Sequence, residues 1–296
     1  MPVPRVRGER PDDPEWRADA LAGSRHSRLA DELREPLDDH DAERSRALCA
    51  EVTRQVLLDF APALIPLPRE ERERAQALTA FALTLFDFAL QSGLEGERLS
   101  QINRWEFNLD LALEGRPPGQ PVFVQLARLG AARPWPRPAL EELVAVARRR
   151  ATVPPRTPDA ARAARGRLAE ALCSALLPED PDEDVRSLAR ALFDVRALQG
   201  TGEGLRRAGA SLPAVGGEIE EAIAGEVSRL RGALAGRRGV RGLPADYRRS
   251  GAYLRRAALG ILAAVERRGR KIVDQPPRLG AGARIGALLA ALITGR

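Results

Sequence analysis

One acidic side chain stands out because it interrupts an apolar stretch of sequence. Asp87 lies between Phe86 and Phe88 in TAFALTLFDFALQSG, residues 79–93. A carboxylate in such surroundings can act as a general acid or base, or as an oxygen ligand for a divalent metal ion. The competing interpretation is structural: Asp87 pairs with an arginine or a helix terminus, or faces outward at the edge of the fold. We expect the structural role, because one carboxylate rarely holds a metal ion alone.

A second acidic residue lies in a glycine-rich segment. Glu203 is the only carboxylate in GTGEG, residues 200–204. Glycine-rich segments can cradle phosphate, but such loops follow a strand and lead into the N-terminus of a helix. No strand pattern precedes this segment, so we expect a turn or a shortened helix.

The remaining reactive residue types give little support to other site chemistries. His26 and His40 lie in a polar N-terminal region, so neither a histidine metal site nor a Ser-His-Asp triad is expected. Cys49 and Cys173 are far apart and fall in helical patterns. We expect them to be buried free thiols, which suits a reducing cytoplasm.

Composition excludes several classes of protein. The chain has 296 residues, 44% hydrophobic, and a net charge of +6. No run of about 18 apolar residues is present, so no membrane-spanning helix is expected. Arginine and glutamate alternate along most segments, which indicates a solvated surface, and no basic block with interleaved aromatics suggests nucleic acid binding. We expect a cytoplasmic protein with at most peripheral membrane contact.

The spacing of apolar residues predicts an all-α fold in one domain. Residues 1–14 are proline-rich and charged, so we expect a disordered lead-in, followed by one helical domain over residues 15–296. After residue 14, apolar residues recur three and four positions apart, as in amphipathic helices. The breaks between these stretches carry proline or glycine, and β-branched residues are sparse. The expected helices are 41–61, 69–92, 97–114, 138–150, 158–177, 182–199, 214–235, 244–268 and 279–293.

Two expectations concern the core. The second half of the helix at 69–92 is apolar on all sides, which predicts a central position in the bundle. Trp105 and Phe107 are expected to be core residues.

Several segments, in order and with the right spacing over about 230 residues, resemble the squalene/phytoene synthase family. They include both ends of a region that in the family is rich in aspartate. The segments are DFAPALIPLPREER (59–72), ALTAFALTLFDFALQ (77–91), INRWEFNLDLALEGRPPGQPVFVQLA (102–127), TPDAARAARGRLAEAL (157–172), ALQ (197–199), RAGASLP (207–213) and YRRSGAYLRRAALGILAAVERRGRKIV (247–273).

The resemblance implies an isoprenoid-synthase-like helical bundle around a central cavity. Members of the family join two prenyl diphosphates head to head to make squalene or phytoene. Two aspartate-rich motifs hold Mg²⁺ against the diphosphate leaving group, whose charge must be neutralised as the carbon–oxygen bond breaks. The first motif is Asp-Asp-x-x-Asp, and its outer acids share one helical face because they are four positions apart.

This chain departs from the family at the residues that the chemistry requires. Phe86 and Leu90 stand at the outer acids of the first motif, and Asp87 matches only the middle acid. In the second region about six residues are missing, and Glu203 is the only acid that remains. This chain differs from the family at other positions too. It has Leu83 where the family has an arginine and Gln91 where the family has an acid. It has Leu64 and Ile65 where the family has a Ser-Arg pair.

The double loss predicts a protein without prenyl-joining catalysis, since catalysis of this kind depends on electrostatic stabilisation of the departing diphosphate. The cavity is expected to be lined by Leu64, Ile65, Leu83, Phe86, Phe88, Leu90, Gln91 and Glu203, with Asp87 as the remnant catalytic candidate and no metal or other cofactor. Candidate partners are a prenyl diphosphate or prenyl lipid, a paralogue of the family, or another protein.

The expected role is therefore binding or assembly in hopanoid or carotenoid metabolism. The alternative is an active, Mg²⁺-dependent transferase that condenses two farnesyl or geranylgeranyl diphosphates, with displaced acids such as Glu106, Asp110 or Glu203 as ligands. A helical scaffold with chance similarity is a third option.

Overall fold

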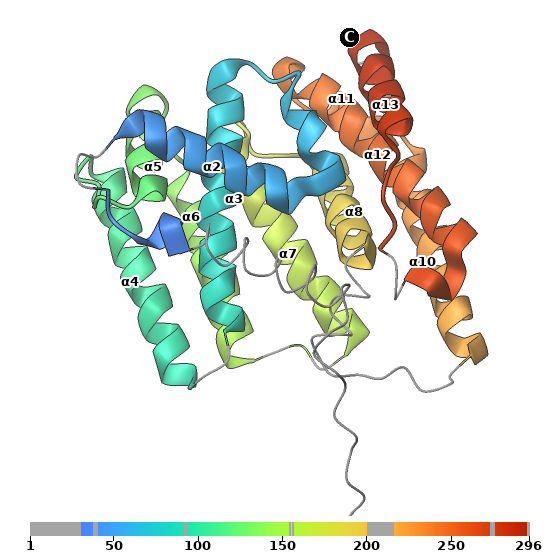
Figure 1. The fold of residues 1–296 in the computed structure, drawn as a ribbon, viewed down its shortest axis with the longest axis horizontal. Coiled ribbons are helices and arrows are strands. Elements are labelled where there is room, and N and C mark those ends of the chain that lie inside the picture. Colours follow the sequence, from blue (N-terminus) through green and yellow to red (C-terminus); the bar gives the residue numbers. More distant parts are fainter. Residues whose placement is uncertain are drawn as a thin grey trace, which may run out of the picture.

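Every regular element in the described part of the chain is a helix, which confirms the expected all-α fold. The computed structural model describes residues 31–37, 41–91, 94–153, 155, 157–199, 216–272 and 276–294 (Figure 1). Its elements are α2 (Ala42–Leu57), η1 (Leu58–Leu64), α3 (Arg69–Leu90), α4 (Glu95–Leu113), α5 (Pro121–Ala132), α6 (Arg137–Thr152), α7 (Pro158–Leu176), α8 (Glu183–Gln199), α10 (Gly216–Ala235), α11 (Arg238–Arg241), α12 (Ala245–Arg268), η2 (Gly269–Ile272) and α13 (Ala281–Thr294).

Local sequence explains where several helices begin. The Asp41 side chain caps α2 by accepting from the backbone N–H groups of Glu43 and Arg44, at 2.9 and 3.0 Å. The Thr157 side chain caps α7 in the same way, and Pro158 fills the first turn, where no hydrogen-bond donor is needed. Capping groups of this kind satisfy N–H groups that the helix itself leaves without partners.

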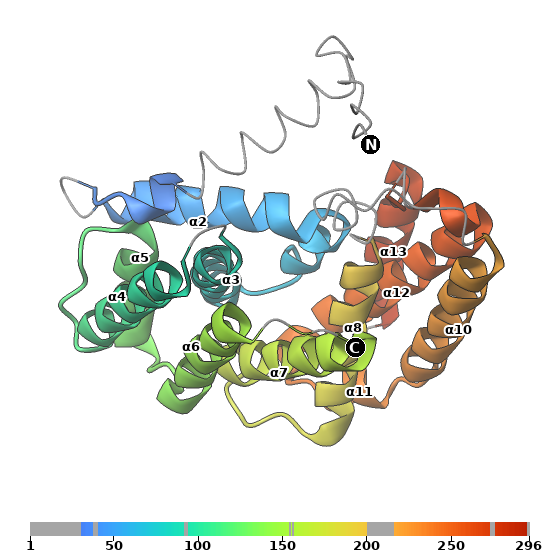
Figure 2. The ribbon, with the colours of Figure 1, turned by 90° about the horizontal axis from the view of Figure 1, so that it is seen from below.

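Helix α3 is the central helix of the first half of the fold. It packs against α2, α4, α5, α6 and α7. Figure 2 shows α3 with α2, α4 and α6 around it. Its buried face joins an aromatic cluster in which the rings of Trp105 and Phe123 have centroids 4.5 Å apart, with Phe81 and Phe88 beside them. The central position expected for this helix is confirmed.

A second core forms around α12, and α7 connects it to the first. Residues of α8, α10, α12 and α13 pack together there with η1. Helix α7 contacts both α6 and α8, and Leu176 at its end packs against both cores. The two groups of helices are therefore joined through α7 (Figure 1).

The structure corrects three details of the sequence-based picture. Helix α5 was not among the expected helices. The helix expected at 41–61 ends at Leu57 and continues as the 3₁₀ helix η1. Trp105 is buried as expected, but Phe107 is 62% exposed and is not a core residue.

Several expectations fall on residues outside the described part of the chain. They concern the lead-in at 1–14, the two histidines and Glu203. The boundary between lead-in and domain stays a prediction. Among the described helices, none combines the length and the apolar character needed to cross a bilayer.

Candidate functional site

The last three turns of α3 carry the residues that the resemblance places at the family's first motif. Leu83, Phe86 and Leu90 are spaced three and four positions apart, so they share one face of the helix. Leu83 and Phe86 are half-buried, whereas Leu90, at the end of the helix, is 60% exposed. None of these three side chains offers an oxygen ligand.

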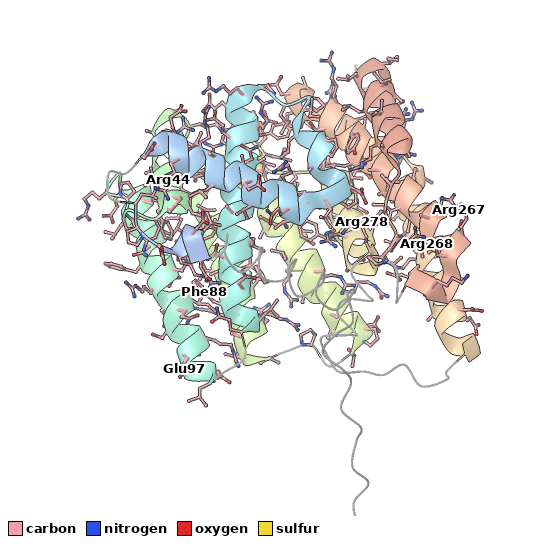
Figure 3. The ribbon with its side chains drawn as sticks, in the orientation of Figure 1. Arg44, Phe88, Glu97, Arg267, Arg268 and Arg278 are labelled. Atoms are coloured by element: carbon pink, nitrogen blue, oxygen red, sulfur yellow. The ribbon has the colours of Figure 1, made fainter. Side chains whose placement is uncertain are left out.

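Asp87 faces a different neighbour. Its carboxylate Oδ2 lies 3.6 Å from Nη2 of Arg34, and both side chains are about three-quarters buried. The guanidinium of Arg34 also lies over the ring of Phe88, 4.7 Å from its centroid (Phe88 is labelled in Figure 3). Leu33, next to Arg34, is completely buried in the first core and fixes this segment in place. Asp87 is therefore a charge partner for Arg34, and whether it has any other role stays a prediction.

A cavity of about 730 Å³ opens beside Phe86, between the end of α6 and the beginning of α7. Its walls are apolar and basic, and none of the residues that line it is acidic. The lining residues are Phe86, Val146, Arg149, Arg150, Thr152, Val153, Pro155, Thr157, Ala160, Ala161, Ala164, Arg165, Arg167 and Leu168. A cavity of this size and character can take an apolar molecule with a small polar head.

The four arginines of the cavity are not equivalent. Arg165 is neutralised by Asp194 of α8, which accepts its Nε–H at 2.9 Å and also binds Arg229 at 2.7 Å. Among the described residues, no carboxylate forms an ion pair with Arg149, Arg150 or Arg167. Burial lowers the pKa of Arg150, as expected for a half-buried cation without a counter-ion. An anion in the cavity would relieve that cost.

The described residues near Phe86 do not fit a divalent metal ion. Such an ion needs several oxygen ligands, and Asp87, the one carboxylate here, faces a guanidinium. No group of three or more His, Cys, Asp or Glu side chains is placed to hold a metal within the described ranges. The proposed substitutes Glu106 and Asp110 form ion pairs with Arg148 and Arg137, between α4 and α6.

The other predicted positions do not line this cavity. Phe88 packs into the aromatic core against Trp105 and does not line this cavity. Ile65 is mostly exposed, and Leu64 and Gln91 are half-buried at the ends of η1 and α3. Of the predicted positions that the structure describes, Phe86 alone lines this cavity.

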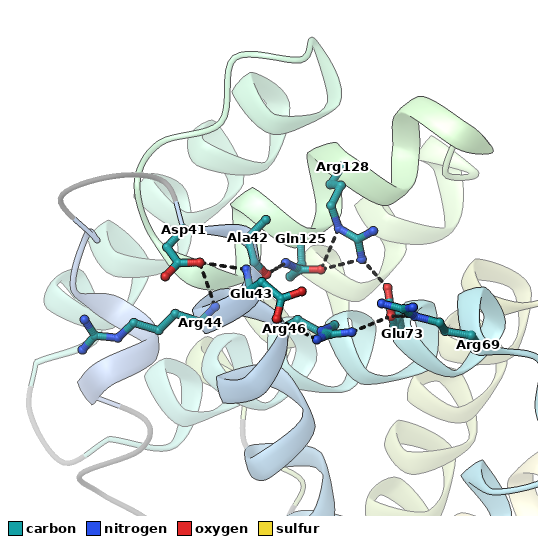
Figure 4. Close-up of polar contacts among 9 residues, drawn as sticks. All are labelled: Asp41, Ala42, Glu43, Arg44, Arg46, Arg69, Glu73, Gln125 and Arg128. Atoms are coloured by element: carbon teal, nitrogen blue, oxygen red, sulfur yellow. Dashed lines mark hydrogen bonds and ion pairs between the residues drawn. The ribbon is translucent and has the colours of Figure 1, made fainter.

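A separate charged cluster at the other end of α3 is structural. Glu73 is buried and contacts the guanidinium groups of three arginines, Arg46 from α2, Arg69 and Arg128 from α5 (Figure 4). Burial alone would raise the pKa of Glu73, but the hydrogen bonds from Arg69 and Arg128 outweigh it, so the pKa lies below its ordinary value. This cluster ties α2, α3 and α5 together.

Sequence reasoning missed the basic residues of the site. Arg149 and Arg150 belong to an arginine run that resembled an ordinary solvated helix end, and Arg34 lies 53 positions before its partner Asp87. The one available signal was the excess of arginine around residues 148–150 without a nearby acid.

Comparisons with known proteins agree with the fold. The sequence profile of the family described as squalene/phytoene synthase matches residues 53–213, just over half of the chain. The structure is similar to that of a dehydrosqualene synthase in complex with ligand, with a TM-score of 0.68 and 15% identity over 85% of this chain and 96% of the other. It is also similar to squalene synthase HpnC from Alicyclobacillus acidocaldarius, with a TM-score of 0.58 and 21% identity over 77% and 95%. No curated protein sequence gives a significant match.

Proposed function

This chain belongs to the squalene/phytoene synthase family, and from that premise we propose that it binds a prenyl diphosphate or prenyl lipid without joining two of them. Active members of the family act on prenyl diphosphates and are generally Mg²⁺-dependent. The proposed role is binding or assembly in prenyl-lipid metabolism of the hopanoid or carotenoid kind, in the cytoplasm.

One observation carries the non-catalytic part of this proposal. Where the resemblance places the outer acids of the first metal motif, this chain has Phe86 and Leu90, and Asp87, at the place of the middle acid, pairs with Arg34. Releasing diphosphate from an allylic carbon requires positive charge held against the leaving group. The acids that would recruit metal ions for this task are missing from α3.

The cavity beside Phe86 supports the binding part. Its alanines, Leu168 and Phe86 suit an apolar tail, and Arg149, Arg150 and Arg167 suit an anionic head. Guanidinium groups can bind diphosphate oxygens directly, so this mode of binding does not require a metal ion. A ligand retained in this way could be presented to a paralogue of the family or to another partner protein.

Isothermal titration calorimetry with farnesyl diphosphate tests the binding. We expect binding that is equally strong in Mg²⁺ and in EDTA. Arg150→Gln should weaken it roughly 10- to 100-fold, because a hydrogen bond to a charged group is worth about 1.5–3 kcal/mol. Arg104→Gln, which removes an exposed arginine on α4, is the matched control and should leave the affinity unchanged.

A parallel assay addresses catalysis. Pyrophosphate release from farnesyl or geranylgeranyl diphosphate should stay at background with Mg²⁺ present. Steady Mg²⁺-dependent release by the wild type that Asp87→Asn abolishes would establish the active transferase instead. An absence of any binding in the calorimeter would refute the binding role.

A further inference from the structure

Helix α13 carries a stripe of large apolar side chains that face solvent. Ile285, Leu289, Leu292 and Ile293 are 58, 56, 36 and 74% exposed. Leu289 lies four positions after Ile285, and Leu292 and Ile293 lie three and four positions after Leu289, so all four share one side of the helix. The opposite side, with Ala287 and Ala291, packs onto the second core. Singly scattered apolar residues are common on protein surfaces, but a stripe of four on one helix indicates a contact surface.

The segment around α13 also holds the excess positive charge of the chain. Residues 267–296 contain seven basic residues and one acid, so this segment alone accounts for the net charge of +6. Arg267, Lys271, Arg278 and Arg284 are exposed. Figure 3 shows Arg267, Arg268 and Arg278 beside the C-terminal helices. Arg284 directly precedes the stripe and Arg278 lies in the segment that leads into α13, so the apolar stripe begins beside exposed basic residues.

The combination of apolar stripe and basic surroundings selects one kind of partner. A second copy of this chain would bring two segments of charge +6 together, and their repulsion opposes a dimer through this face. Nucleic acid would attract the arginines but would leave the isoleucine and leucine side chains without a partner. A bilayer with anionic lipids satisfies both features, since its acyl region takes up apolar side chains and its head groups attract Lys and Arg.

We propose that α13 is the surface by which this protein docks onto anionic membranes, with the helix lying in the plane of the bilayer. At 14 residues, α13 is about 21 Å long and too short to cross a hydrocarbon core of about 30 Å. Its exposed stripe enters the interfacial region while Leu288 and Ala291 keep it attached to the protein. This docking surface is independent of the proposed ligand and of catalysis.

Flotation of the full chain with lipid vesicles tests this docking surface. Vesicles of phosphatidylcholine with one quarter phosphatidylglycerol should bind the protein, and binding should fall as salt is raised, while pure phosphatidylcholine should bind it far more weakly. The triple variant Ile285→Ser/Leu289→Ser/Ile293→Ser should weaken binding to anionic vesicles by roughly 100-fold or more, because each buried aliphatic side chain contributes roughly tenfold or more. Phe107→Ser removes an equally exposed apolar residue from α4 and should have no effect.

A second pair of variants separates local charge from overall charge. Arg267→Gln/Lys271→Gln should weaken binding roughly 25-fold, since each cation near the surface contributes about fivefold. Arg44→Gln/Arg104→Gln makes the same change in net charge on exposed residues of α2 and α4 and should have little effect. Circular dichroism should show that all variants are folded.

Three outcomes would overturn the proposal. They are an absence of binding to anionic vesicles, equal binding by the stripe variant and the wild type, and equal binding to neutral and anionic vesicles. Light scattering supplies a further check: a wild-type dimer that the stripe variant converts to a monomer would assign this face to self-association.

Discussion

Gln199, the last residue of α8, donates a hydrogen bond from Nε2 to Oδ2 of Asp59, 140 positions earlier in the chain, at 2.8 Å. The same amide also donates to the carbonyl of Pro277 at 2.8 Å. Asp59 in turn accepts from the N–H of Leu279 through Oδ2 and from the hydroxyl of Tyr253 through its carbonyl. Both Gln199 and Asp59 are buried. This pair therefore joins η1, α8 and the segment that leads into α13.

Removing the amide should leave a buried carboxylate short of donors. We expect Gln199→Ala to lower the free energy of unfolding by about 1.5–3 kcal/mol, measured by urea denaturation, because the lost bond is to a charged group. Gln55→Ala is the matched control, since Gln55 donates to Glu51 at 2.9 Å on the partly exposed side of α2. That change should cost no more than about 0.5 kcal/mol. If the two variants lose the same free energy of unfolding, the hydrogen bond between Gln199 and Asp59 contributes no more to stability than an exposed one.

Two aromatic residues of α4 should differ sharply in their contribution to stability. Trp105 is 4% exposed and contacts three other aromatic rings, whereas Phe107 is 62% exposed. Trp105→Ala should therefore lower the free energy of unfolding by about 3–5 kcal/mol. Phe107→Ala should change it by no more than about 0.5 kcal/mol. Urea denaturation measures both. A large loss for Phe107→Ala would mean that a further part of the protein covers this face of α4.

Stability should fall at alkaline pH because of Cys49. Burial raises the pKa of its thiol from 9.0 to about 12. Between these values the folded state keeps a proton that the unfolded state loses, so rising pH favours unfolding by about 1.4 kcal/mol per pH unit for this group. Urea denaturation from pH 8 to 11 should show that the free energy of unfolding declines less steeply with pH in Cys49→Ala than in the wild type.

The two proteins are compared by the slope of the free energy of unfolding against pH. The small cavity left by alanine lowers stability by a similar amount at every pH, so it does not change this slope. Parallel curves for the two proteins would contradict the burial of this thiol. Cys49 should also resist alkylation in the folded protein and react once urea unfolds it.

Much of the fold could be predicted from local patterns. Recurring apolar residues, proline breaks and capping residues depend on neighbours within one or two turns, so they predicted most helices to within a few residues. The same rules could have corrected Phe107, because two positions along a helix correspond to about 200°, and Trp105 and Phe107 therefore face opposite sides. Helix α5 was missed although Pro121 stands at its first position, where proline is favoured because no hydrogen-bond donor is needed there.

The sequence by itself determined the helical class and the family resemblance. Only the tertiary structure decided that Asp87 meets Arg34, that Arg149 and Arg150 reach the cavity beside Phe86, and that α13 keeps an apolar stripe in solvent. The physical reason is range: helical periodicity is set by residues three and four positions apart, whereas ion pairs, cavity walls and uncovered faces depend on which distant segments the packing of the two cores brings together.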